Sequence, residues 1–142
     1  MATIELTKKI SFEAAHRLGK GYKGPCKNIH GHSWNVELTV QCEELNTYDM
    51  GIDFDEISQF NRQIKDEFDH KLILYKEDIA LINVCKKEGY ELVIMNKNPT
   101  SEVIAAYIFE KADTYFSNKG KGITILSVTI EETCTSRCVW KR

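Results

Sequence analysis

The chain has 142 residues, of which 42 % are hydrophobic and 28 % are charged, as expected of a globular domain that buries its own core. Its net charge of −2 argues against a strongly basic surface for nucleic acid or an anionic membrane, and leaves room for a local basic pocket. No apolar run approaches the roughly 20 residues of a membrane helix, and the first residues lack a signal-peptide core. We therefore expect a single cytoplasmic domain over residues 1–142. The five cysteines, an odd number, argue against a disulfide framework.

Two strands joined by a glycine-rich loop are predicted at the start of the chain. Residues 4–15 alternate loosely between apolar and polar side chains, and residues 17–29 contain three glycines and Pro25. The alternation is strict over residues 32–42, which predicts a half-buried strand. Its apolar face consists of Trp34, Val36, Leu38 and Val40.

A helix and a shorter second helix are predicted next. Apolar side chains recur at helical spacing over residues 55–68, and either Asp53 or Asp55 can cap the N-terminus of that helix. Residues 76–89 predict a shorter helix that ends at Gly89.

The last third of the chain predicts a long helix between strands. Residues 90–95 predict a short strand, and Thr100 is a suitable N-cap for a helix that continues to about residue 116. Residues 123–132 alternate, and residues 137–141 predict a final short strand. Helices that fall between pairs of strands favour an α+β fold with an antiparallel sheet over a doubly wound parallel one.

Three of the four histidines suggest a metal site. His30 and His32 are separated by one glycine, so in extended backbone both imidazoles point to the same face. His16 follows the first predicted strand, and antiparallel pairing of the first two strands would bring it beside them. Three neutral imidazoles suit Zn²⁺ and leave a coordination position for water or substrate. The alternative is a strand entry with one exposed and one packed histidine.

The role of Cys26, four residues before His30, stays open on spacing alone. As a fourth ligand it would close the metal site, and closed sites are usually structural. As a free thiol near the ion it could become a thiolate base or nucleophile. It could also be a small buried residue without chemistry.

Two further groups of polar residues could contribute to a site. Asp69 directly precedes His70, and a carboxylate beside an imidazole can fix its tautomer, although a solvated pair at a helix end is equally consistent. Glu131 and Glu132 end an alternating strand. A carboxylate that faces inward there could bind a ligand with a guanidine-like edge. The alternative, which the motif alone favours, is a pair of solvated acids at the end of the strand.

In combination, these residues resemble the 6-pyruvoyl-tetrahydropterin synthase superfamily. Six motifs occur in the order of that family and span nearly the whole chain. They are FEAAHRL (12–18), CKNIHGHSW (26–34), GIDFDEI (51–57), FDHKL (68–72), NPTSEVIAAYIFE (98–110) and EETCTSRC (131–138). The step of four residues from Cys26 to His30 and the ending ETCT most resemble the 6-carboxy-5,6,7,8-tetrahydropterin synthase branch, which acts in queuosine biosynthesis.

The resemblance implies a role for each matching residue. The zinc ligands would be His16, His30 and His32. Cys26 would act as the general base, and His70, supported by Asp69, as the partner acid or base. Glu132 would anchor the pterin ring and could take part in proton transfer. Weaker candidates for the pterin pocket are Thr100, Ser101 and Glu102.

The implied reaction converts 7,8-dihydroneopterin triphosphate to 6-carboxy-5,6,7,8-tetrahydropterin, acetaldehyde and triphosphate. The implied architecture is the tunnelling (T) fold, with a four-stranded antiparallel sheet and two main helices on one face. Such subunits commonly assemble into a homohexamer with active sites at subunit interfaces. Residues 74–98 form a longer stretch than in compact members, which predicts a short inserted helix and strand.

Two alternatives accompany this prediction. A 6-pyruvoyl-tetrahydropterin synthase would share the metal site but release a different product. A non-catalytic, zinc-stabilised pterin-binding protein would use the metal, closed by Cys26, only to hold the fold.

Overall fold

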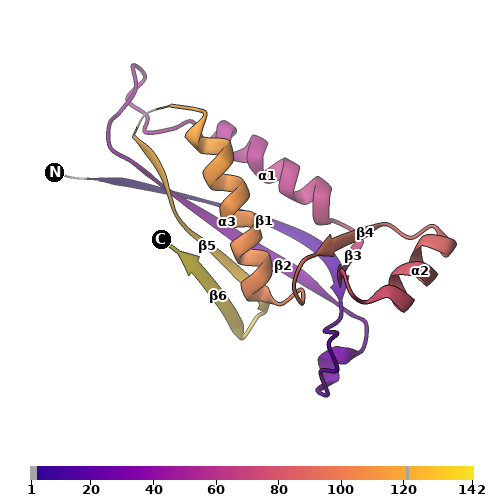
Figure 1. Ribbon diagram of the computed structural model, residues 1–142. Helices are drawn as coiled ribbons and strands as arrows, with labels where there is room; N and C mark the ends of the chain where they lie inside the picture. The colour runs from indigo at the N-terminus through magenta and orange to yellow at the C-terminus, as the bar shows by residue number, and fades with distance from the viewer. Residues whose placement is uncertain (1–2, 121) are drawn as a thin grey trace.

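The computed structural model describes residues 3–120 and 122–142, and within these ranges the chain forms six strands and three α-helices (Figure 1). The elements in chain order are β1 (Ile4–His16), β2 (His30–Cys42), α1 (Phe54–Phe68), β3 (Lys71–Tyr75), α2 (Ile79–Glu88), β4 (Leu92–Met95), α3 (Ser101–Ser117), β5 (Ile123–Thr133) and β6 (Ser136–Lys141). A single turn of 3₁₀ helix, Pro25–Lys27, lies in the loop between β1 and β2. In the described ranges, no helix has both the length and the apolar character needed to cross a membrane.

The strands form one mixed sheet in the order β4-β3-β1-β2-β5-β6. Neighbours in the series β1, β2, β5 and β6 are antiparallel, but β3 is parallel to β1 and β4 is parallel to β3. The α+β class is confirmed. The prediction of a four-stranded antiparallel sheet is wrong for the sheet as a whole, because the sheet has six strands and two of them, β3 and β4, run parallel to a neighbour. The inserted helix and strand are present as α2 and β4.

The strand that the sequence did not predict is β3. Its residues KLILY are a short apolar run without alternation, which does not distinguish a strand from other buried structure. The segment becomes a strand because it pairs with the last three residues of β1, from Ala14 to His16. The connection through α2 then returns the chain parallel to β3, as a helical crossover permits.

The core lies between the sheet and the two long helices. Figure 1 shows α1 and α3 on the same face of the sheet, with α2 beside β3 and β4. The four apolar residues predicted for the inner face of β2 are all buried. The ring of Phe12 in β1 stacks on Trp34 of β2 and on Phe68 of α1, at ring-centroid distances of 6.2 and 5.1 Å, respectively. This packing fixes the ends of β1 and β2, where the histidines lie.

The helix ends follow the capping signals in the sequence. The Asp53 side chain accepts a hydrogen bond from the backbone N–H of Asp55 at 2.8 Å, so Asp53 is the cap of α1. Thr100 caps α3 by accepting from the N–H of Val103 at 3.2 Å. Gly89 ends α2 with a φ of 78°, a left-handed conformation that glycine adopts without strain.

Candidate functional site

The three predicted metal ligands lie together at one end of the sheet. His16 at the end of β1 pairs directly with His30 at the start of β2, and His32 follows two residues later on the same face. The ring centroids are 4.6 Å apart for His16 and His30, 5.1 Å for His16 and His32, and 4.9 Å for His30 and His32. Each residue offers one ligand atom within 4.8 Å of the other two. The strand register therefore forms the cluster that the spacing predicted.

Backbone carbonyls orient two of the imidazoles. His16 Nδ1 lies 2.7 Å from the Pro99 carbonyl oxygen, and His30 Nδ1 lies 2.7 Å from the Asn28 carbonyl oxygen. A carbonyl only accepts, so in both rings Nδ1–H donates and Nε2 carries a lone pair. The Nε2 atoms of all three histidines are buried and have no hydrogen-bond partner among the described residues. Lone pairs that converge in this way fit a Zn²⁺ ion, which neutral imidazole binds well.

The electrostatics of two of the three histidines, His16 and His32, favour uncharged rings. The pKa of His16 is lowered from 6.5 to about 4, mainly by burial and additionally by the two neighbouring imidazoles, although the hydrogen bond to Pro99 opposes this shift. Burial also lowers the pKa of His32, against the opposing charge of Glu132. Protons therefore compete weakly for these nitrogen atoms near neutral pH.

Glu132 lies beside the histidine cluster. Its Oε1 atom is 3.3 Å from His16 Nε2 and 3.6 Å from His32 Nε2, but neither contact has hydrogen-bond geometry. Its side chain is 27 % exposed, so a ligand in the site could contact the carboxylate. The sequence offered two glutamates at this strand end, and the structure brings Glu132 to the histidines.

Cys26 lies in the single 3₁₀ turn of the loop between β1 and β2. Its thiol is free and half-buried, and its carbonyl oxygen accepts a hydrogen bond from the N–H of Leu18 at 2.8 Å. In residues 3–120 and 122–142, the group that could hold a metal ion consists of the three histidines, and Cys26 is not part of it. The geometry thus gives no support to Cys26 as a fourth ligand.

Asp69 and His70 form a hydrogen-bonded pair where α1 ends. Asp69 Oδ2 is 2.9 Å from His70 Nδ1, and Asp69 Oδ1 accepts from the N–H of Glu13 at 2.9 Å. These two donors, the Glu13 N–H first, lower the pKa of the Asp69 carboxyl. His70 has a φ of 60° and a side chain that is 79 % exposed. It lines a hollow of about 510 Å³ to which His32 also contributes.

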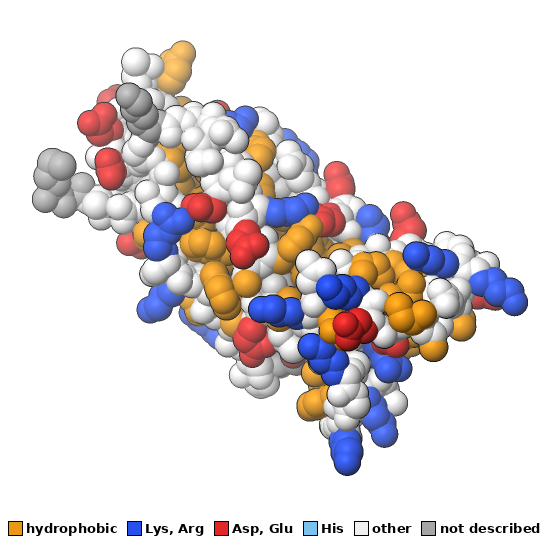
Figure 2. All heavy atoms as spheres, in the orientation of Figure 1, with side chains coloured by type: hydrophobic (Ala, Val, Ile, Leu, Met, Phe, Trp, Pro, Cys, Tyr) orange, Lys and Arg blue, Asp and Glu red, His pale blue; other side chains and the backbone are white. Residues whose placement is uncertain are grey.

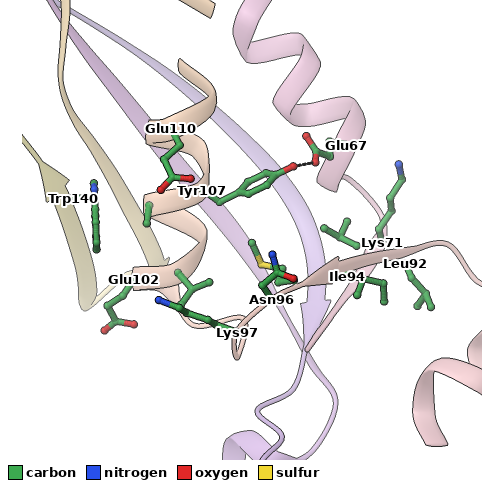
Figure 3. A pocket seen from close by; sticks show the side chains of 14 residues that line it. Glu67, Lys71, Leu92, Ile94, Asn96, Lys97, Glu102, Tyr107, Glu110 and Trp140 are labelled. Atoms are coloured by element: carbon green, nitrogen blue, oxygen red, sulfur yellow. Dashed lines mark hydrogen bonds between the residues drawn. The ribbon is translucent and has the colours of Figure 1, made fainter. Parts of the chain in front are cut away.

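The three weaker candidates lie at the start of α3. Thr100 uses its hydroxyl to cap the helix, and Ser101 Oγ lies 3.5 Å from Glu102 Oε2. Glu102 lines a second cavity of about 500 Å³ between β4, α3 and β6, where the Tyr107 hydroxyl points to Glu67 (Figure 3). Within the described ranges, no histidine contributes to the lining of this cavity.

Sequence reasoning missed the groups that orient the site. The carbonyls of Pro99 and Asn28 hold two imidazoles, and the backbone of Glu13 holds both Asp69 and the N–H of His70, the latter at 2.6 Å. Backbone groups leave no residue-type signal, so the sequence offered none.

Known proteins with similar sequences are tetrahydropterin synthases by name. The chain is 29 % identical over 139 residues to the 6-carboxy-5,6,7,8-tetrahydropterin synthase of Bacillus subtilis, with 98 % of this chain and 86 % of that protein covered. It is 34 % identical over 107 residues to the protein of that name from Rickettsia typhi, with 74 % and 77 % covered.

Solved structures share the fold. An uncharacterized protein from Wolinella succinogenes superposes with a TM-score of 0.85 at 23 % identity and covers 99 % of each chain. The 6-pyruvoyl tetrahydropterin synthase of Plasmodium vivax superposes with a TM-score of 0.78 at 20 % identity, with 100 % of this chain and 99 % of that chain covered. The family model for 6-pyruvoyl tetrahydropterin synthase matches residues 5–142, nearly the full length. The chain therefore belongs to the 6-pyruvoyl tetrahydropterin synthase family.

Proposed function

We propose that this protein is a zinc-dependent lyase, a 6-carboxy-5,6,7,8-tetrahydropterin synthase of queuosine biosynthesis. It would convert 7,8-dihydroneopterin triphosphate and water to 6-carboxy-5,6,7,8-tetrahydropterin, acetaldehyde and triphosphate. The observation that carries the proposal is the convergence of three buried Nε2 atoms without hydrogen-bond partners, two of them on rings fixed by backbone carbonyls. The names of the curated relatives support the choice of product. The cytoplasmic location stays an expectation from the sequence.

The proposed metal site uses His16, His30 and His32. When bound, Zn²⁺ would supply Lewis-acid polarisation of the side-chain oxygens of the substrate. Glu132, whose carboxylate is partly exposed beside His16 and His32, would accept hydrogen bonds from the guanidine-like edge of the pterin ring and so orient the side chain. Thr100, Ser101 and Glu102 stay weaker proposals for the ring pocket, and the capping role of the Thr100 hydroxyl reduces its availability.

Cys26 and His70 would move the protons. Cys26 would remove a proton from the substrate side chain, because its thiol is free and is not needed as a metal ligand. Asp69 fixes the tautomer of His70 by accepting from Nδ1, which leaves the exposed Nε2 to give or take a proton. The proposed homohexamer would place these groups at subunit interfaces, and the 79 % exposure of the His70 side chain is consistent with such a role.

The test is incubation of the zinc-loaded protein with dihydroneopterin triphosphate and identification of the products by mass. We expect acetaldehyde and the 6-carboxy product from the wild type. Substitution of Cys26→Ala should reduce kcat by at least about 100-fold without loss of zinc, as expected for a general base. Cys134→Ala is the matched control, because Cys134 is an exposed free cysteine.

The alternatives predict different outcomes. A 6-pyruvoyl product would assign the tetrahydrobiopterin-type activity instead. A folded, zinc-loaded protein that binds the pterin and releases no product would identify a non-catalytic binding protein. Rapid alkylation of Cys26 while zinc stays bound would exclude the closed structural site.

A further inference from the structure

The loop that joins the two histidine-bearing strands has an unusual charge. Residues 17–29 connect His16 to His30 and contain four cationic residues and no acidic one. The cations are Arg17, Lys20, Lys23 and Lys27. The net charge of the whole chain is −2 and that of this loop is +4, so the rest of the chain has a net charge of −6. The positive charge is therefore concentrated beside the proposed metal site, against the sign of the rest of the protein.

The first half of this loop contacts the inserted segment, residues 74–98. Arg17 Nε lies 2.9 Å from Asp78 Oδ2, and the N–H of Gly19 donates to Asn98 Oδ1 at 2.8 Å. The ammonium group of Lys20 lies 4.6 Å from the centre of the Tyr75 ring. Arg17 and Lys20 are thus held by residues outside the loop, and the loop is fixed at its base.

The second half of the loop presents cations without protein partners. Lys23 and Lys27 are exposed, and in residues 3–120 and 122–142 neither ammonium group has a carboxylate oxygen within 4.0 Å. Figure 2 shows lysine and arginine side chains at the lower end of the molecule, where Figure 1 places this loop. Lys23 lies two residues before the turn that carries Cys26, and Lys27 is the last residue of that turn, so an anion held by them would lie near the proposed base.

The course of the chain is compatible with one direction of the substrate. Glu132, the proposed anchor of the pterin ring, contacts His16 and His32. The loop leaves the cluster from His16 and returns to His30. A substrate whose ring lies at Glu132 and whose side-chain oxygens lie at the histidines would extend its far end toward the loop.

We propose that Lys23 and Lys27 form a polyphosphate subsite that binds the triphosphate of the substrate. This inference rests on the proposed function for the identity of the ligand. Lysine is a compact cation that binds phosphate oxygens as a point charge, and an exposed pair would attract the polyanion and orient the substrate side chain past Cys26.

The test is isothermal titration calorimetry, which measures the affinity of the zinc-loaded protein for inorganic tripolyphosphate. The variant is Lys23→Gln/Lys27→Gln, and the matched control is Lys86→Gln/Lys87→Gln, which removes the same charge from exposed lysines of α2. We expect the first variant to bind about tenfold more weakly and the control to stay within about twofold of the wild type, with the difference shrinking as salt rises. Equal affinities of the two variants at low salt, with equal zinc content and unchanged melting, would overturn the subsite.

A second measurement separates this inference from the proposed function. With dihydroneopterin triphosphate, the loop variant should raise KM about tenfold with little change in kcat, while the control should not. An unchanged KM would overturn the subsite even though the enzyme turns over. Absence of turnover in the wild type would overturn the proposed function instead, and the tripolyphosphate titration would still decide the subsite.

Discussion

Removal of His30 should abolish tight zinc binding without unfolding the protein. His30 supplies one of the three converging Nε2 atoms, and it lies at the edge of the cluster with partial exposure, whereas His16 is only 1 % exposed. Loss of a residue that merely supports a ligand costs about 10- to 100-fold in metal affinity, so loss of the ligand itself should cost about 100-fold or more.

The expected change in thermal stability follows from mass action. Zinc at a thousand times its Kd stabilises a folded protein by about 4 kcal/mol. For a chain of this size, that corresponds to a rise in Tm of about 12 °C. A 100-fold weaker site at the same zinc concentration would retain only about 1.4 kcal/mol, and the rise would shrink to about 4 °C.

The measurement is a competition titration against a chromophoric chelator, combined with melting curves in zinc and in EDTA. His70→Ala is the matched control, because it makes the same substitution at a 79 % exposed side chain outside the cluster. The control should keep the wild-type affinity and the full rise in Tm. Wild-type zinc affinity in His30→Ala would show that the three imidazoles do not form the site.

Three further predictions concern pH, the cysteine loop and a helix cap. Folding lowers the pKa of His16 from 6.5 to about 4, so as the pH falls the imidazole is protonated in the unfolded chain before it is protonated in the folded one. The free energy of unfolding of the zinc-free protein should therefore decrease by about 3 kcal/mol between these two pH values. Urea unfolding of wild type and His16→Gln checks this, and equal pH slopes would contradict it. Asp78→Asn should weaken the contact to Arg17 and speed hydrogen exchange at the Leu18 amide at least about fivefold. The control is Asp113→Asn, which disturbs the exposed ion pair to Arg142. Unchanged exchange in Asp78→Asn would mean that the Arg17 contact does not hold the loop. Thr100→Ala should cost about 1 kcal/mol in chemical denaturation and Thr100→Ser much less, and a silent Thr100→Ala would rule out the cap.

Local sequence patterns determined most of the secondary structure. Strict alternation located β2, because the inner side chains from Trp34 to Val40 are buried and those between them are not. Helical spacing and capping residues located α1 and α3, since both signals act within a few neighbouring residues. The spacing of His30 and His32 likewise fixed their common face, because side chains alternate along a strand.

Tertiary structure decided the features that depend on distant partners. The residues KLILY of β3 have no diagnostic period, and they form a strand only because the edge of β1 offers unpaired backbone groups at Ala14 to His16. The same long-range contacts set the chemistry of the site. Burial of His16 lowers the pKa of its imidazole. The carbonyl of Pro99, which is 83 residues away in the chain, orients the same ring. The course of β5 brings Glu132 to the cluster. Sequence determined which residues could bind a metal, and folding determined which nitrogen atoms face one another and in what protonation state.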